Sequence, residues 1–230
     1  VTDHAPYSLH IQELTIEAWV KLGPLPLARE IIIRKSIDSV WGSFSLQVEV
    51  DGKVLLTVQD KTNSRWPVWR TVSALTSNVW YHIAGTFKKG YYDYRDGKIY
   101  INNVEQTTVF SANGYASGFM IEYTTEGLFI GMQQGISYPL KGVIDEVRIS
   151  DIARTTFDLT VAPSADANTV ALWHFDESVG NKAYDATTND NDGTIYGAKW
   201  AGPEWTTGKF GNALQFDGIN DYVEVPDSDS

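Results

Sequence analysis

The sequence contains no cysteine, and this absence excludes several classes of protein chemistry. Disulfide frameworks, thiolate catalysis and cysteine-ligated zinc sites all need a residue that is missing here. No apolar run approaches the roughly 20 residues of a membrane-spanning helix, so membrane insertion is not expected. The first residues, VTDH, do not form a signal peptide, and the lack of an initial Met predicts a fragment or processed product.

Basic residues are also scarce, because 18 Lys and Arg stand against 29 Asp and Glu, for a formal net charge of −11. This charge repels phosphate backbones and anionic membranes, so nucleic acid is not an expected partner. An acidic surface is compatible with a divalent cation or a neutral polysaccharide. The sequence also lacks a nucleophile elbow and a phosphate-binding glycine-rich loop.

Alternation of apolar and polar residues is the dominant pattern in the chain, together with an aromatic content of 13%. Leu14, Ile16, Ala18 and Val20 fall on one face of a predicted strand. The pair Asp51-Gly52 separates two alternating runs, which is typical of a hairpin. No segment has helical periodicity over three turns, and the many short strands favour a sandwich or barrel. Further strands are expected at 128–132, 142–150, 169–175, 213–216 and 222–225.

Several stretches resemble the LamG-like repeat of the concanavalin A-like lectin/glucanase superfamily. They are LTIEAWVK at 14–21, WYHIAGTF at 80–87, KIYIN at 98–102, GVIDEVRI at 142–149, ALWHFDE at 171–177, GKFGNALQFDG at 208–218 and DYVEV at 221–225. The resemblance implies an all-β, two-sheet antiparallel jelly-roll sandwich over 1–230.

The order of these stretches is rotated relative to the family, in which the segment resembling 171–225 comes first. The chain therefore divides into a major part at 1–159, a linker-like seam at 160–168 and, at 169–230, equivalents of the family's opening strands. Residues 1–150 alone would leave unpaired sheet edges. We expect the C-terminal segment to fold back as in a circular permutant or to complete a neighbouring chain by strand exchange. The alternative is that 169–230 is a disordered remnant of the next repeat, against which its aromatic content argues. The last residues, VPDS at 225–228, resemble the first, VTD at 1–3. This similarity indicates that the chain spans about one period of a tandem array.

Asp145 is the most informative carboxylate. It shares strand parity with Val143, Val147 and Ile149, which predicts that it points towards the apolar face, where a carboxylate needs a cation, a metal or several donors. The resemblance implies a structural calcium ion at this position, with further ligands near Asp176, Gly218 and Asp221, and calcium favours such oxygen donors. The alternative is an ion pair with Arg148 or a lysine.

A second candidate site consists of aromatic and basic side chains, namely Trp66, Trp69, Arg70 and Tyr92. Tryptophan faces suit the C–H faces of sugars, and arginine can donate to hydroxyl groups. The alternative is that the tryptophans cover the edge of the core or contact a neighbouring repeat.

Catalysis has little support in the sequence. The resemblance would imply a Glu-x-Asp-x-x-Glu strand in a retaining glucanase, and no such motif is present. Adjacent carboxylates such as Asp145 and Glu146 are expected on opposite faces of a strand. We therefore interpret the chain as a non-catalytic binding or adhesion module of an extracellular or cell-surface protein. Its expected partners are a polysaccharide or glycoprotein glycan and neighbouring repeats. A spacer without ligand and a glycoside hydrolase or lyase are the alternatives.

Overall fold

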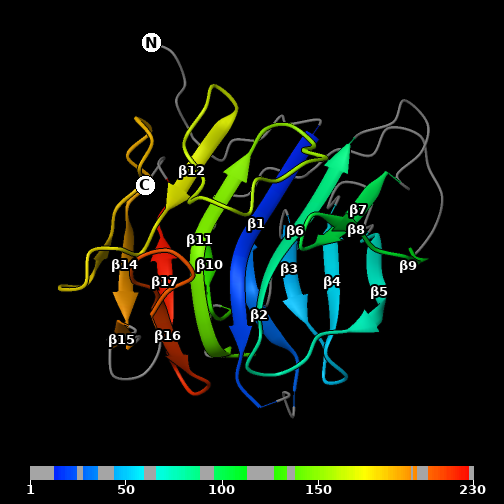
Figure 1. Ribbon diagram of the computed structural model, residues 1–230, viewed down its shortest axis with the longest axis horizontal. Helices are drawn as coiled ribbons and strands as arrows, with labels where there is room; N and C mark the ends of the chain where they lie inside the picture. Colours follow the sequence, from blue (N-terminus) through cyan, green and yellow to red (C-terminus); the bar gives the residue numbers. More distant parts are fainter. Residues whose placement is uncertain are drawn as a thin grey trace.

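The computed structural model describes residues 13–24, 28–35, 44–59, 66–88, 96–112, 127–133, 138–197, 199–200 and 207–227. These residues form no helix, and their strands build two antiparallel sheets that lie one in front of the other (Figure 1). The predicted fold class, a two-sheet all-β sandwich, is confirmed.

The first sheet has the order β15-β16-β11-β1-β6-β7-β8, and β12 also pairs with β11. Its strands are β1 (Glu13–Leu22), β6 (Trp80–Lys88), β7 (Gly97–Ile101), β8 (Val104–Glu105), β11 (Lys141–Ser150), β12 (Thr169–Trp173), β15 (Lys199–Trp200) and β16 (Leu214–Asp217). The second sheet has the order β13-β14-β17-β10-β2-β3-β4-β5-β9. Its strands are β2 (Glu30–Lys35), β3 (Phe44–Val48), β4 (Lys53–Val58), β5 (Val68–Ala74), β9 (Thr108–Ser111), β10 (Leu128–Ile130), β13 (Lys182–Ala183), β14 (Gly193–Tyr196) and β17 (Tyr222–Val225).

Alternation places the core as the sequence predicts. Leu14, Ile16 and Ala18 on β1 are fully buried in the main hydrophobic cluster between the sheets. The predicted hairpin joins β3 to β4, and Gly52 in its turn has φ of 76°, a conformation that favours glycine.

The C-terminal segment supplies strands to both sheets of the same chain. In the first sheet, β12 and β16 both pair with β11, and in the second, β17 pairs with β10. Trp173 and Phe216 from this segment are buried in the same core cluster as Leu14. A Cβ at Gly131, which has φ of 84°, would overlap the Phe216 ring, so this glycine permits the contact between the two parts.

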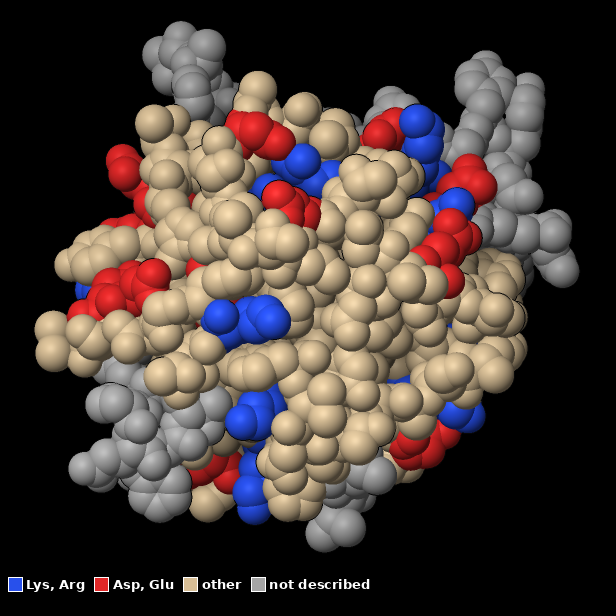
Figure 2. Space-filling view, in the orientation of Figure 1, with Lys and Arg blue, Asp and Glu red and all other residues tan. Residues whose placement is uncertain are grey.

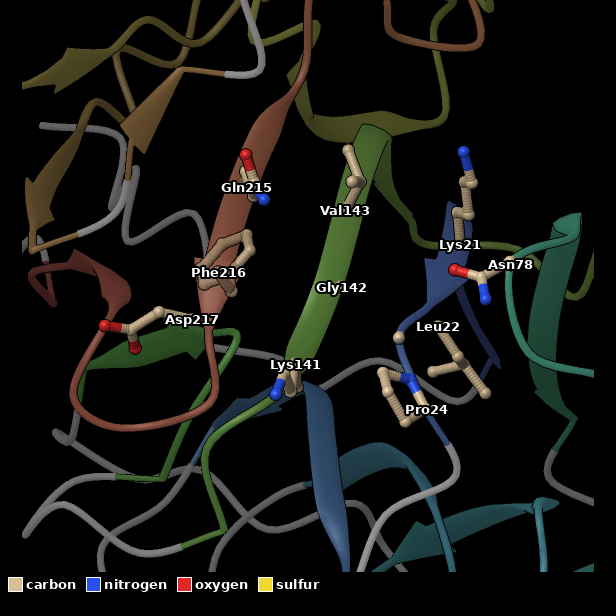
Figure 3. A pocket seen from close by; sticks show the side chains of 11 residues that line it. Lys21, Leu22, Pro24, Asn78, Lys141, Gly142, Val143, Gln215, Phe216 and Asp217 are labelled. Carbon is tan, nitrogen blue, oxygen red and sulfur yellow. The ribbon is translucent and has the colours of Figure 1, made fainter. Parts of the chain in front are cut away.

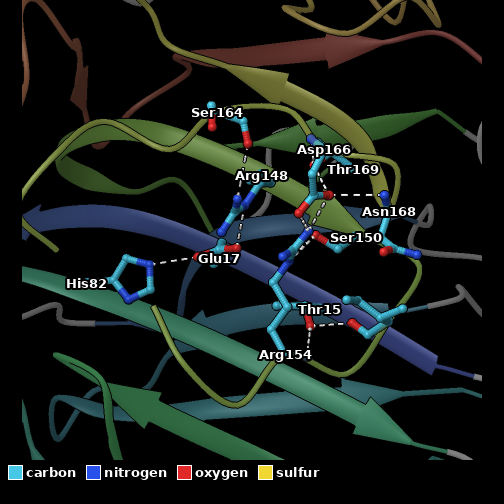
Figure 4. A network of polar contacts seen from close by, with 11 residues as sticks. Thr15, Glu17, His82, Arg148, Ser150, Arg154, Ser164, Asp166, Asn168 and Thr169 are labelled. Atoms are coloured by element: carbon cyan, nitrogen blue, oxygen red, sulfur yellow. Dashed lines mark hydrogen bonds and ion pairs between the residues drawn. The ribbon is translucent and has the colours of Figure 1, made fainter. Parts of the chain in front are cut away.

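Residues 151–168, which we call the strap, lie along the first sheet and include the predicted seam (Figure 4). Arg154 donates from Nη2 to both carboxylate oxygens of Asp166, at 2.7 and 2.8 Å. Arg148 on β11 donates from Nη1 to the carbonyl oxygen of Ser164 at 3.4 Å. The seam is therefore held to the sheet by hydrogen bonds.

A buried polar network on β1, β6 and β11 lies next to the strap (Figure 4). Glu17 accepts a hydrogen bond from Arg148 Nε at 2.7 Å, and its other carboxylate oxygen lies 2.9 Å from His82 Nε2. Burial alone would raise the pKa of Glu17, but the hydrogen bonds and charges of His82 and Arg148 outweigh it and hold the pKa below its usual value. The ring of Phe157 in the strap packs on His82, with centroids 5.0 Å apart.

A second buried carboxyl group predicts a pH dependence of stability. Burial raises the pKa of Glu30, at the start of β2, to about 7, and its Oε2 has no hydrogen-bond partner in the described ranges. The folded protein therefore keeps this proton above the pH at which the unfolded chain releases it, so stability falls as the pH rises from about 4.5 to about 7. We expect Glu30→Gln to leave stability nearly unchanged at pH 4.5 and to raise it by up to about 3 kcal/mol at pH 8. Urea unfolding of both proteins at the two pH values measures this, and an equal difference at both would contradict it.

Candidate functional site

A depression on the outer face of the second sheet gathers polar side chains from β2, β3 and β4. Cross-strand register aligns Arg34, Ser45, Thr57 and Val68 in one row across four strands. We call this depression the polar groove; its lining residues are Arg29, Arg34, Ser45, Gln47, Leu55, Thr57, Gln59, Trp66 and Val68. Because the residues of the row alternate with core residues along each strand, the sheet itself fixes their outward direction.

A buried amide oxygen in the polar groove is unpartnered within the described part of the chain. Gln47 is buried, and its Oε1 accepts no hydrogen bond from the described residues. Ser45 and Thr57, by contrast, satisfy each other, with 2.6 Å between their hydroxyl oxygens. A buried amide oxygen usually has a donor, so this atom is suited to a hydroxyl group from a ligand or a water molecule.

The structure separates the four residues predicted to bind a ligand. Trp66 lines the polar groove, whereas Trp69 is 1% exposed and packs in the core between the rings of Phe87 and Phe110. A ring with no exposed face cannot stack on a sugar, so the inclusion of Trp69 is corrected. Arg70 does not line the groove and is ion-paired with Asp51. Tyr92 lies outside the described residues.

On the other side of the molecule, Asp145 lies on β11 opposite Trp19 of β1, and both point out of the sandwich. The prediction that Asp145 faces the core is therefore wrong. The cause is a β-bulge in the pairing of β1 with β11, where the register shifts between Glu17 and Trp19 of β1. Glu146 of β11 lies at this bulge with φ of 51°, and the bulge shifts the alternation of side chains by one residue. Val147 and Ile149 beyond the bulge are core residues, as predicted.

The segment Gly208–Asn212 folds over Asp145 and Asp176. Phe210 N–H donates to Asp145 Oδ2 at 3.0 Å, and Asn212 N–H donates to Asp176 Oδ1 at 2.6 Å. A Cβ at Gly211, which has φ of 59°, would overlap the Asp176 carboxylate, so glycine permits this close approach. The two carboxylates thus come from the major part at 1–159 and from the C-terminal segment at 169–230, and both are held by one segment.

Burial and mutual repulsion dominate the electrostatics of the carboxyl groups in this region. Asp145 is fully buried, and its Oδ1 has no hydrogen-bond partner among the residues that the structure describes. Burial raises the pKa of Asp145 to about 8, and the charges of Glu146 and Asp176 act in the same direction. Burial also raises the pKa of Glu146, although His174 Nδ1 lies 2.5 Å from its Oε2 and opposes this shift. We call Asp145, Glu146 and Asp176 the carboxylate cluster.

The negative charge of Asp176 acts to raise the pKa of both Asp145 and Glu146, so the two neighbouring carboxyl groups share one electrostatic environment. The other two predicted metal ligands are not part of it. Gly218 and Asp221 lie in the β16–β17 turn, where Gly218 abuts Lys141 and Asp221 Oδ2 accepts the N–H of Asp217. This turn is at the opposite end of β16 from Asp145, because Asp217 pairs with Lys141 and Leu214 with Ile144.

The carboxylate cluster fits an oxygen-ligated cation in donor chemistry. Within the described residues, no three His, Asp or Glu side chains are arranged to hold a metal by themselves. A cation here would therefore combine Asp145 Oδ1 and Asp176 with backbone oxygens, a mixture that calcium accepts and zinc does not favour.

Two solved structures are similar to this chain. The CBM40 of Ruminococcus gnavus IT-sialidase, solved with α2,3-sialyllactose, is 16% identical with a TM-score of 0.50, and the match covers 63% of this chain and 78% of that one. The heptameric SAP-like pentraxin of Limulus polyphemus is 19% identical with a TM-score of 0.48, covering 69% and 76%.

The search of curated proteins gave no significant match. None of the described residues form a helix long and apolar enough to cross a bilayer. Residues 2–160 match the family described as the concanavalin A-like lectin/glucanases superfamily, which is well over half of the sequence. The chain therefore belongs to the concanavalin A-like lectin/glucanases superfamily.

Proposed function

We propose that this protein is a non-catalytic glycan-binding module that holds its ligand in the polar groove. The observation that carries the proposal is the groove floor, where the unpartnered Gln47 Oε1 lies among hydroxyl and guanidinium side chains. These groups match the hydroxyls of a saccharide, and Trp66 supplies an aromatic face for its C–H groups. The sialyllactose-bound CBM40 supports carbohydrate as the ligand class.

The groove predicts a specific loss of binding. We expect Trp66→Ala to weaken glycan binding about tenfold or more, which corresponds to about 1.4 kcal/mol. A glycan array identifies a ligand, and calorimetric titration then compares the variant with wild type. Tyr184→Ala is the control, because Tyr184 is 58% exposed and lies outside the groove. Equal affinity of wild type and Trp66→Ala, or silence of the wild type on every glycan, would favour a spacer module instead.

We further propose that calcium occupies the carboxylate cluster and stabilises the fold. The support is the fully buried Asp145 with its unpartnered Oδ1 beside Asp176. Calcium would bring positive charge to the place where the major part at 1–159 meets the C-terminal segment at 169–230.

Calcium at 100 times its dissociation constant is expected to raise the free energy of unfolding by about 2.7 kcal/mol. Asp145→Asn should remove this gain. Asp221→Asn is the matched control and should retain it, because Asp221 lies in the β16–β17 turn. Denaturant unfolding with calcium and with chelator measures the difference. A calcium response that survives in Asp145→Asn, or that disappears in Asp221→Asn, would place the ion elsewhere.

The same interpretation extends to the parent protein. We propose that β12, β16 and β17 take the place of the family's opening strands, and that the module acts outside the cell within an array of similar modules. Weak binding by each module would then be strengthened by multivalency. A turnover assay on β-glucans and alginate tests the competing enzyme hypothesis, which saturable activity would support.

A further inference from the structure

A hollow lies on the outer face of the first sheet, where β1, β11 and β16 run side by side (Figure 3). Register places Lys21, Val143 and Gln215 in one row across these strands, so the short valine lies between two longer side chains. We call it the lysine hollow; its lining residues are Lys21, Leu22, Gly23, Pro24, Asn78, Lys141, Gly142, Val143, Gln215, Phe216 and Asp217. It is on the opposite sheet from the polar groove.

Three lysines on this face, Lys21, Lys141 and Lys209, are not ion-paired with a described carboxylate, unlike most other lysines and arginines. Neither Lys21 nor Lys141 forms an ion pair among the residues that the structure describes, and Lys209 instead lies 4.4 Å from the Trp19 ring. Apart from Arg34, which also has a partner, every other lysine or arginine with a described side chain is paired with a carboxylate. In a chain of net charge −11, unpaired cations on one face are unexpected.

The two lysines line different ends of the hollow, and in Figure 3 the Lys21 side chain extends away from Lys141. Lys21 pairs in register with Val143, and Lys141 is two residues away on the same face of β11, so the two are diagonal neighbours about 7–8 Å apart at Cα. Figure 2 shows isolated basic side chains in the centre and lower part of this face, with mostly uncharged surface between them. The Asp217 carboxylate points away from Val143 in Figure 3 and accepts the N–H of Ile219.

The surroundings of the lysines suit a sugar. Trp80 pairs with Lys21 across β1 and β6 and is only partly buried, and Gln215 and Asn78 offer amide groups on either side of the hollow. Aromatic faces contact C–H groups, amides bind hydroxyls, and ammonium groups bind carboxylates. The net charge of −11 disfavours a dense polyanion, so a saccharide with few acidic units fits better than nucleic acid or an anionic membrane.

We propose that the lysine hollow is a second binding site, which binds an acidic saccharide through carboxylates that lie near Lys21 and near Lys141. The proposal goes beyond the polar groove and does not depend on it. It gives the module two saccharide-binding faces, one on each sheet.

The test uses trigalacturonate and its carboxyl-reduced form, which keeps the linkages but lacks the charge. We expect the full chain to bind trigalacturonate at 50 mM salt at least tenfold more tightly than the reduced form. The double variant Lys21→Gln/Lys141→Gln should lose this preference, and Lys21→Arg/Lys141→Arg should retain most of it. Lys98→Gln is the control, because Lys98 is on the same sheet but paired with Glu105.

Each outcome of the titrations is decisive. Thermal unfolding first establishes that the variants are folded. Trp66→Ala should bind trigalacturonate like wild type, which separates this site from the polar groove. Failure of wild type to bind trigalacturonate, equal binding of the reduced form, or an equal loss in Lys98→Gln would overturn the proposal.

Discussion

A chain that ends at Thr160 is expected not to fold, although it contains the whole stretch that matches the family. It would lack buried core side chains, and each large apolar one contributes roughly 1.5–3 kcal/mol when buried. The lost core residues are Ala171, Trp173, Phe175, Ala183, Ile195, Leu214, Phe216, Val223 and Val225. Their summed contribution is as large as or larger than the typical domain stability of about 5–15 kcal/mol. The edges of β10 and β11 would also lose their partners.

Circular dichroism and hydrogen exchange of the 1–160 fragment measure this outcome. Residues 161–230, added as a separate chain, should restore the signal of the folded sandwich. A 1–160 fragment that unfolds cooperatively with native-like stability would show that the front portion is complete without them.

Trp69→Ala is expected to destabilise the protein by about 3–5 kcal/mol, because it empties a large core site. The Trp69 ring is 1% exposed, lies between Phe87 and Phe110, and abuts Gly97, where a Cβ would overlap it. Trp66, three residues earlier, lines the polar groove, and its replacement should change stability by much less. Urea unfolding of both variants makes the comparison.

The two tryptophans therefore form a matched pair with opposite expected effects. Trp66→Ala should weaken glycan binding with little loss of stability, and Trp69→Ala should do the reverse at temperatures where it remains folded. Similar losses of stability in both variants would mean that Trp66 is also a core residue.

Alternation predicts much of this fold, since a strand with one buried face repeats every two residues. Leu14, Ile16 and Ala18 are core residues as expected, and the Asp51-Gly52 hairpin is present. Alternation also predicts the position of Trp69. If the charged Arg70 faces the solvent, its neighbour Trp69 on the same strand must face the core. The sequence of 65–70 suggested a platform instead, because tryptophan suits both a core and a ligand site.

The carboxylate cluster shows where the sequence carries too little information. Alternation predicts the direction of Asp145 only if β11 has no bulge. The residue with positive φ at this bulge is Glu146, and because it is not a glycine the sequence gives no sign of the bulge. The sequence also does not show which segment folds over a carboxylate. Gly208–Asn212 reaches Asp145 through tertiary packing of residues 65 positions apart, while the similar turn at Gly218 does not.

The lysine hollow depends on a feature that composition conceals. A net charge of −11 suggests a uniformly acidic surface. Carboxylates neutralise most of the described lysines and arginines, however, and Lys21, Lys141 and Lys209 remain without an ion pair on one face. Pairing is a property of the folded protein, because Lys98 meets Glu105 only through the β7–β8 hairpin.

Native-state hydrogen exchange tests most directly whether both parts of the chain form one sandwich. The amides in the β11–β16 and β10–β17 ladders should exchange with the same free energy of opening as those in the β1–β6 ladder. Exchange of the β16 and β17 amides through a separate opening of much lower free energy, with β1 and β6 still protected, would contradict the account.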